Sequence, residues 1–179
     1  MDRRQFLAAA GLSLAVPAAG CSAPGDPTGT PAPQRVTVNF TNDGGRTLVF
    51  TAAVMVEGFG GVELTDADGG TETFPDAETV DDVPAEAWER AVTFTPLGDA
   101  QRRQFRSTDG SGIGIEFEPM PYGSTVVTTL ADPNAEPPMR STGAGTCGEA
   151  EEAAIRVIVD ADGLVHQSTT CTDTGTPSY

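Results

Sequence analysis

The sequence predicts an all-β domain, a single antiparallel sandwich of two sheets. Short segments alternate apolar and polar residues, and clusters of Gly, Asp and Pro separate them, while helical periodicity is almost absent. About 145 residues follow residue 34, which suits one domain with a workable core. Eight or nine such strands favour a two-sheet sandwich, and a small closed β-barrel is the alternative.

The first expected strands lie between residues 36 and 74. Residues 36–40 alternate strictly, whereas residues 48–56 are apolar on both faces, which predicts a central strand covered on both sides. Residues 62–64 and 71–74 flank a turn rich in Asp and Gly, a pattern typical of a hairpin. Residues 84–90 are expected to form one helical turn after an acidic loop.

The second half of the chain continues the β pattern. Further strands are predicted at residues 92–94, 101–106, 113–117 and 124–130. Residues 131–146 are polar and contain three prolines, so they are interpreted as a long excursion without a strand. Residues 155–159 and 164–170 flank Asp-Ala-Asp-Gly, the strongest hairpin signal in the chain. The β domain is therefore expected to span residues 35–171, followed by a tail at 172–179.

Residues 1–20 have the features of an export signal. Arg3 and Arg4 precede a weakly apolar stretch at residues 7–16. Ten residues span about 15 Å as a helix, too little for a hydrocarbon core of about 30 Å, so a secretory signal is favoured over a membrane span. The arginine pair directly before Phe-Leu is typical of the twin-arginine class, an address that a receptor reads.

Residues 18–21, Ala-Ala-Gly-Cys, resemble a lipobox, in which the Cys21 thiol receives a lipid. Two acyl chains on one residue anchor firmly, because each buried CH₂ contributes about 0.8 kcal/mol. Residues 21–34 are rich in Pro, Gly, Ser and Thr, which predicts an extended tether. We therefore expect a chain anchored by a lipid at the outer face of the cell membrane. An ordinary signal with a cysteine there by chance is the alternative.

The formal net charge is −16, and every basic residue except the single His is arginine. Residues 1–20 carry a net charge of +1, so the remainder carries −17. Such a surface repels itself at low salt, and salt screens this repulsion within about 3 Å at 1 M. Dispersed acid without lysine, behind a twin-arginine lipobox, resembles the exported lipoproteins of haloarchaea, and this resemblance covers the signal and the composition only. The strand order is loosely similar to immunoglobulin-like modules of cell surfaces, although the Cys–Trp–Cys spacing of antibody domains is missing.

The sign of the charge argues against nucleic acid as a partner, because phosphate binding needs clustered basic residues. The one basic cluster comprises Arg102, Arg103 and Arg106. We expect these arginines to lie on one strand and to pair with neighbouring carboxylates.

Cys147 and Cys171 form an even pair once Cys21 is assigned to the lipid. The last predicted hairpin folds Cys171 back toward residues 152–154, close to Cys147. Outside the membrane a disulfide persists, and closing this loop would stabilise the fold by roughly 3 kcal/mol. A metal pair is the alternative, but it lacks further Cys or His ligands.

No catalytic residues are predicted. His166 is the only histidine, and its place within a strand predicts a side chain facing solvent or the sheet edge. Ser111 lies in a turn-like Asp-Gly-Ser-Gly sequence and not in a nucleophile elbow. One histidine also excludes the usual blue-copper ligand set. Met55, Met120 and Met139 are interpreted as packing residues.

Two further motifs carry weaker hypotheses. Asp66, Asp68 and Glu72 surround a tight turn and could supply oxygen ligands for calcium, although a turn in an acidic protein explains them as well. Asn39-Phe-Thr is an N-glycosylation acceptor pattern, and alternation places Asn39 opposite the core face of its strand. A plain strand asparagine is the competing interpretation.

These observations favour a non-catalytic, lipid-tethered protein with a binding or structural role at the cell surface, its partner a surface protein or a glycan. The alternatives are a surface hydrolase that uses carboxylates or calcium, and an accessory binding protein of a transporter. No cofactor other than calcium is suggested.

Overall fold

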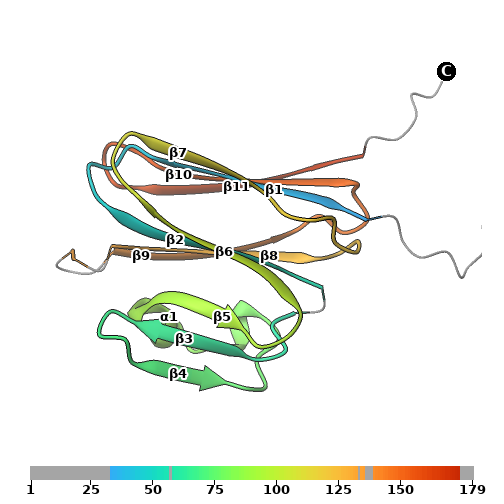
Figure 1. The fold of residues 1–179 in the computed structure, drawn as a ribbon, viewed down its shortest axis with the longest axis horizontal. Coiled ribbons are helices and arrows are strands. Elements are labelled where there is room, and N and C mark those ends of the chain that lie inside the picture. Colours follow the sequence, from blue (N-terminus) through green and yellow to red (C-terminus); the bar gives the residue numbers. More distant parts are fainter. Residues whose placement is uncertain (1–32, 57, 133, 136–138, 174–179) are drawn as a thin grey trace, which may run out of the picture. The chain divides into compact units, whose positions relative to one another are not determined.

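The computed structural model describes residues 33–56, 58–132, 134–135 and 139–173. The chain divides into two units, Met1–Thr30 and Pro31–Tyr179, and all described residues belong to the second. Eleven strands in three sheets, one short 3₁₀ helix and one short α-helix make up this part of the chain (Figure 1). The predicted all-β class is therefore confirmed.

The first sheet has the strand order β11-β10-β1-β7. Its strands are β1 (Arg35–Asn42), β7 (Ser111–Glu116), β10 (Glu152–Val159) and β11 (Val165–Thr172). β10 and β11 form the predicted antiparallel hairpin. β1 and β10 run parallel, with Val38 opposite Ile155, so the expectation of a purely antiparallel fold is wrong here. These two strands lie far apart in sequence, and no tight turn fixes their relative direction.

The second sheet has the strand order β6-β2-β8-β9 and is antiparallel throughout. Its strands are β2 (Leu48–Met55), β6 (Ala100–Ser107), β8 (Thr125–Asp132) and β9 (Met139–Thr146). β9 corrects the expectation of a strandless segment at residues 131–146. Its sequence, Met-Arg-Ser-Thr-Gly-Ala-Gly-Thr, lacks apolar alternation because small and polar residues suffice at the edge of a sheet.

The first two sheets enclose the larger core. Alternate residues of β1 and β10 face inward and pack against one face of β2 and β8. At its centre the rings of Phe40 and Phe50 stack, with their centroids 4.4 Å apart. Both sheets keep open edges, so the alternative of a small closed barrel is wrong.

A third sheet covers the opposite face of the second sheet, so the prediction of only two sheets is wrong (Figure 1). It consists of β3 (Val62–Asp66), β4 (Thr71–Phe74) and β5 (Ala91–Pro96) in the order β4-β3-β5. The 3₁₀ helix η1 (Val80–Asp82) and the helix α1 (Ala85–Arg90) lie between β4 and β5 in sequence, and α1 confirms the expected helical turn.

A second core joins this layer to the second sheet. Phe59, Trp88 and Phe94 form an aromatic cluster with ring centroids about 6 Å apart, and Met55 and Val127 of the second sheet belong to the same core. All eight residues of β2 are buried, as predicted for a strand covered on both sides. Met55 and Met120 are buried, which confirms their packing role, whereas the side chain of Met139 lies outside the described residues.

The predicted disulfide is present and links the first two sheets at one edge. Cys147 follows β9 directly, Cys171 lies in β11 opposite Ala153, and their Cα atoms are 5.3 Å apart. β9 and β11 pack closely along this edge, so a Cβ on Gly143 would collide with the Gln167 side chain. Thr128 Oγ1 also donates a hydrogen bond of 3.0 Å to Gln167 Oε1. Disulfide and side chains together close this edge of the sandwich.

Candidate functional site

The described residues contain no group of three or more His, Cys, Asp or Glu side chains that could hold a metal ion. Two of the three calcium candidates, Asp66 and Glu72, have local roles instead. Asp66 Oδ1 accepts hydrogen bonds from the backbone N–H groups of Asp68 and Gly70, at 3.0 and 2.7 Å, and so closes the β3–β4 turn. Glu72 pairs with Arg90 at 2.8 Å. The arrangement therefore gives the calcium hypothesis no support.

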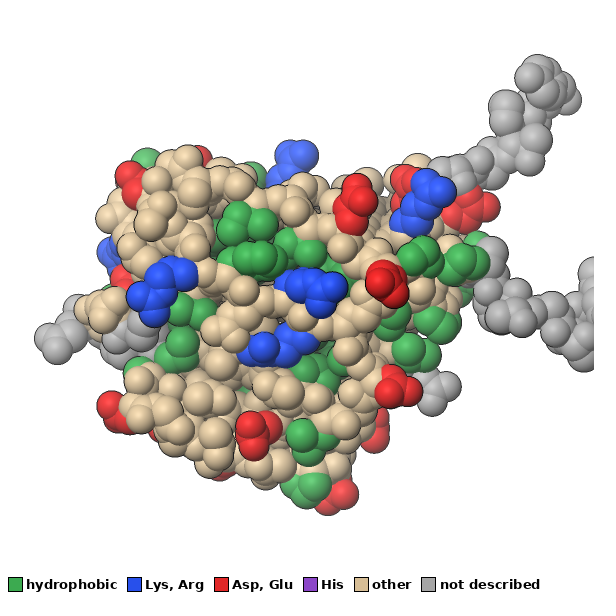
Figure 2. Space-filling view, viewed as in Figure 1, with side chains coloured by type: hydrophobic (Ala, Val, Ile, Leu, Met, Phe, Trp, Pro, Cys, Tyr) green, Lys and Arg blue, Asp and Glu red, His purple; other side chains and the backbone are tan. Residues whose placement is uncertain are grey.

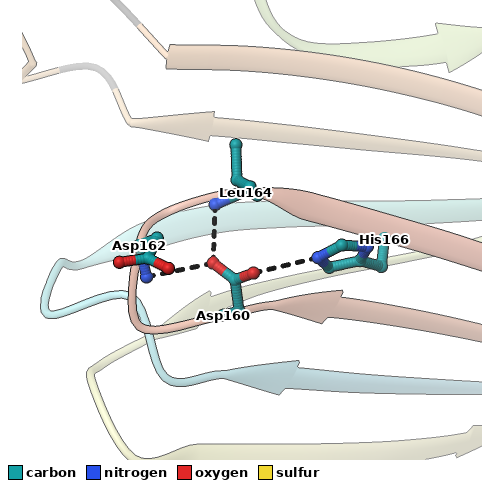
Figure 3. A network of polar contacts seen from close by, with 4 residues as sticks. All are labelled: Asp160, Asp162, Leu164 and His166. Carbon is teal, nitrogen blue, oxygen red and sulfur yellow. Dashed lines mark hydrogen bonds and ion pairs between the residues drawn. The ribbon is translucent and has the colours of Figure 1, made fainter.

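His166 lies on β11 and takes part in a polar network at the β10–β11 turn (Figure 3). Its Nε2 is 2.9 Å from Asp160 Oδ2, while Asp160 Oδ1 accepts hydrogen bonds from the backbone N–H groups of Asp162 and Leu164. The hydrogen bond from His166, and after it the N–H of Leu164, lowers the pKa of Asp160. The side chain of His166 is 60% exposed, which confirms the predicted solvent-facing histidine.

This pair has no nucleophile beside it among the described contacts. The hydroxyl of Ser111 lies 2.6 Å from that of Ser107 and bonds to the Thr108 carbonyl. The His166–Asp160 pair therefore joins the two ends of a hairpin turn, and its geometry indicates a structural role.

Asn39 lies on β1 with its side chain exposed, between Gly114 of β7 and Arg156 of β10 in the register. The expectation that it points away from the core is confirmed, while its glycosylation stays a prediction. The export-signal arginines Arg3 and Arg4 and the lipidation candidate Cys21 lie outside the described residues.

An open cavity of about 560 Å³ lies between the third layer and strands β8 and β9. Its buried floor includes Met55, Phe59 and Val127, while the exposed acids Glu78 and Asp81 stand at its rim. Cavities of this size, apolar with a few polar groups, commonly hold small molecules. The acidic rim suits a neutral or cationic amphipathic ligand.

The loop that carries this rim is fixed by a carboxylate. Asp82 Oδ2 accepts hydrogen bonds from the backbone N–H groups of Glu78 and Thr79, at 3.0 and 2.8 Å, and from the Thr79 hydroxyl at 2.9 Å. These bonds, that of the Thr79 N–H foremost, lower the pKa of Asp82. On the inner side, Trp88 Nε1 donates to the Val80 carbonyl at 3.0 Å. The rim is therefore held from both sides.

The arginine cluster lies on β6, at the free margin of the second sheet. The expectation that Arg102, Arg103 and Arg106 pair with carboxylates is wrong for the described part of the chain, where none of the ion pairs includes them. Figure 2 shows basic side chains in the middle of the visible face, over β6, with acidic side chains spread mostly around them.

Arg102 is held in place by neutral oxygens. Its Nε donates to the Phe94 carbonyl of β5, and its Nη2 donates to Thr93 Oγ1 and Gln104 Oε1, all at 2.6 Å. Thr51 of β2 extends this network to the second sheet through a contact of 2.9 Å with Thr93. Burial lowers the pKa of the Arg102 guanidinium. The result is a fixed cation whose Nη1 has no hydrogen-bond partner among the described residues.

Sequence reasoning named the arginines but missed the cavity. Its lining comes from four separate segments, and only the packing of the third layer on the second sheet brings Phe59 and Val127 together. The one available signal was the apolar character of both faces of β2, which indicated a second layer of cover.

No protein-family model matches this sequence, and no curated protein matches it either. Among solved structures the chain has a distant likeness to a chain described as a trapped toxin, to the human-specific toxin intermedilysin and to a non-hemolytic pneumolysin from Streptococcus pneumoniae strain ST306. The TM-scores are 0.33, 0.33 and 0.34, each at 9% identity, over 78–79% of this chain. The match spans 24% of each of those chains. The described residues therefore define a fold class: an all-β protein of three sheets with a disulfide between Cys147 and Cys171.

Proposed function

We propose that the chain is an exported, lipid-anchored binding protein without catalytic activity, which holds its β-sandwich domain at the outer face of the cell membrane. The observation that carries the proposal is the disulfide between Cys147 and Cys171. Disulfides persist in oxidising surroundings and are rare in the cytosol. An oxidised pair therefore agrees with the export signal and with a lipid on Cys21.

One feature supports a binding role. The cavity beside Glu78 and Asp81 offers room for a small amphipathic ligand. The strongly negative surface repels nucleic acid, so the partners we propose are surface proteins, glycans and small molecules.

The anchor is tested by mass spectrometry and fractionation in the exporting host. The expected product begins at Cys21, carries a lipid mass on that residue, and needs detergent rather than salt for release from membranes. The variant Cys21→Ala should lose the lipid, whereas the neighbouring control Ser22→Ala should behave as the parent chain. An unmodified thiol at residue 21 of the exported parent chain would refute the anchor.

The cavity is tested with Nile red, a neutral apolar dye, on the Cys21→Ala chain, which has no lipid of its own to bind dye. Its fluorescence should rise on binding, and adding Ala144→Trp, which fills the cavity from β9, should remove most of that rise. Ala154→Trp on the outer face of β10 serves as the control. Equal fluorescence in all three chains would count against a ligand site in this cavity.

A further inference from the structure

We propose that β6 binds an extended acidic segment of a partner protein, which adds a strand to the free edge of the second sheet and pairs its carboxylates with Arg102, Arg103 and Arg106. This goes beyond the proposed function, because it depends neither on the lipid nor on the cavity.

The edge is open to such a partner. β6 is eight residues long and pairs with β2 on one side only. No backbone hydrogen bond joins its other side to a further segment within the described ranges. A row of unpaired N–H and C=O groups is a template for an incoming strand, as in recognition by strand addition.

Within the described residues, the three arginines on this edge have no carboxylate partner. Arg35 and Arg90 each reach a glutamate, at 3.7 and 2.8 Å, as expected in a chain of net charge −16. The three arginines of β6 reach none in the part of the chain that the structure describes, although acidic residues outnumber basic ones by more than two to one. Cations that the protein itself leaves without carboxylates are available to the carboxylates of a partner.

The side chain of Arg102 is already oriented by hydrogen bonds. Neutral oxygens already hold its Nε and Nη2 edges, so the orientation of the guanidinium is fixed before a partner arrives. Its Nη1, which has no hydrogen-bond partner among the described residues, is left to donate to a carboxylate oxygen. Ordering one donor in advance reduces the entropy that binding would otherwise cost.

The same arginines select the type of strand. A second copy of β6 would bring two sets of arginines onto one ladder, and like charges opposite each other destabilise a strand pair. A neutral strand would gain only the main-chain hydrogen bonds. An acidic polysaccharide could neutralise the arginines but would leave the edge N–H and C=O groups in water. An acidic peptide strand satisfies both the ladder and the charges.

The register defines the partner's pattern. Arg102 and Arg106 lie opposite Ala53 and Val49 of β2, so they share one face of the sheet, and Arg103 lies on the other face. A strand with acidic residues at alternate positions therefore meets Arg102 and Arg106 from one side. Arg103, at the exposed margin, can reach a carboxylate from the other side.

The test measures binding of a blocked peptide, about ten residues long, of alternating Glu and Thr to the purified full chain. Titration calorimetry should detect the Glu-Thr peptide and not its Gln-Thr counterpart. Arg106→Gln should weaken binding by about 2- to 5-fold, the range of exposed ion pairs. Arg103→Gln should weaken it less, because Arg103 lies on the face where this peptide presents Thr. Arg156→Gln removes the same charge from an exposed position on β10 and should leave the affinity unchanged.

Hydrogen exchange separates the two classes of polyanion. The bound peptide should protect backbone amides within residues 100–107. Polygalacturonate that binds without this protection, in place of the peptide, would overturn the proposal in favour of a glycan surface. Equal binding of the Gln-Thr peptide, or no binding of the Glu-Thr peptide, would overturn it as well.

Discussion

Reducing the disulfide between Cys147 and Cys171 should lower the stability of the β domain by about 3.5 kcal/mol. The two cysteines are 24 positions apart, and the chain-entropy model gives about 3.5 kcal/mol at 25 °C for a closed loop of this length. The loop contains all of β10 and most of β11, so opening it frees a hairpin of the first sheet in the unfolded chain. With about 2–4 °C per kcal/mol for a domain of this size, the melting temperature should fall by about 7–14 °C.

Thermal unfolding of the full chain, followed by circular dichroism with and without reductant, measures this change. The double variant Cys147→Ala/Cys171→Ala should unfold near the temperature of the reduced parent chain, and reductant should not affect it. Alanine is preferred to serine because Cys147 is part of the buried core. The denaturant m-value should rise on reduction, since the unfolded chain then exposes more surface.

A shift below about 3 °C on reduction would refute the reasoning, because it corresponds to less than about 1 kcal/mol. The close contacts of Gly143 with Gln167, and the bond from Thr128, would then hold this edge by themselves.

Three further predictions concern single residues. Gly58→Ala should destabilise the domain at least twice as much as Gly69→Ala, by thermal unfolding, because both have positive φ but only at Gly58 would the Cβ meet a backbone oxygen, 2.5 Å away. Asp160→Asn should lower the melting temperature at pH 7. Since the folded-state pKa of Asp160 is depressed below 3.8, this deficit should be full above about pH 4 and vanish as the pH falls through that lowered pKa; a deficit constant with pH would contradict the role of His166. In an exporting host that glycosylates proteins, Asn39→Gln should remove a glycan mass from the intact protein, and identical masses apart from the substitution would leave Asn39 a plain strand residue.

Alternation predicted most strands because burial on one face leaves a clear period of two. β1 and β10 illustrate this, since their alternate residues are buried as the sequence indicates. The same pattern did not predict β9, because its Gly143 and Gly145 pack against the polar Gln167 and Thr169 and not against apolar side chains. A strand whose inward face is glycine has no hydrophobic signal to detect.

The number of sheets was harder to predict than the number of strands. The two apolar faces of β2 require two layers of cover, and this requirement follows from the sequence. The hairpin of β3 and β4 is local and was predicted, but β5 pairs with β3 across an intervening segment, so the sequence does not show that the three strands form their own sheet. The parallel pairing of β1 with β10 is non-local in the same way.

The partners of Arg102 are determined by the segments that pack around it and not by the composition of the chain. In a chain with so many acids, pairing with a carboxylate was the natural expectation for Arg102, yet the groups within its reach are the Phe94 carbonyl, Thr93 and Gln104. Which oxygens a side chain meets depends on the segment that packs beside its strand. For β6 that segment is β5, and the sequence did not predict that β5 packs there.

Substitution of Arg102 should therefore lower the stability of the domain more than substitution of Arg103. Its bonds to β5 attach the third layer to the second sheet, so Arg102→Gln should cost about 1.5–3 kcal/mol, the range for a hydrogen-bonded charge. Arg103 is exposed, and among the described residues its side chain bonds only to the Arg102 carbonyl, so Arg103→Gln should change stability by less than about 0.5 kcal/mol. Urea unfolding of both variants measures the difference. Equal stability of the two would mean that the Arg102 network does not attach the third layer, and that Arg102 offers a partner no more order than any exposed arginine.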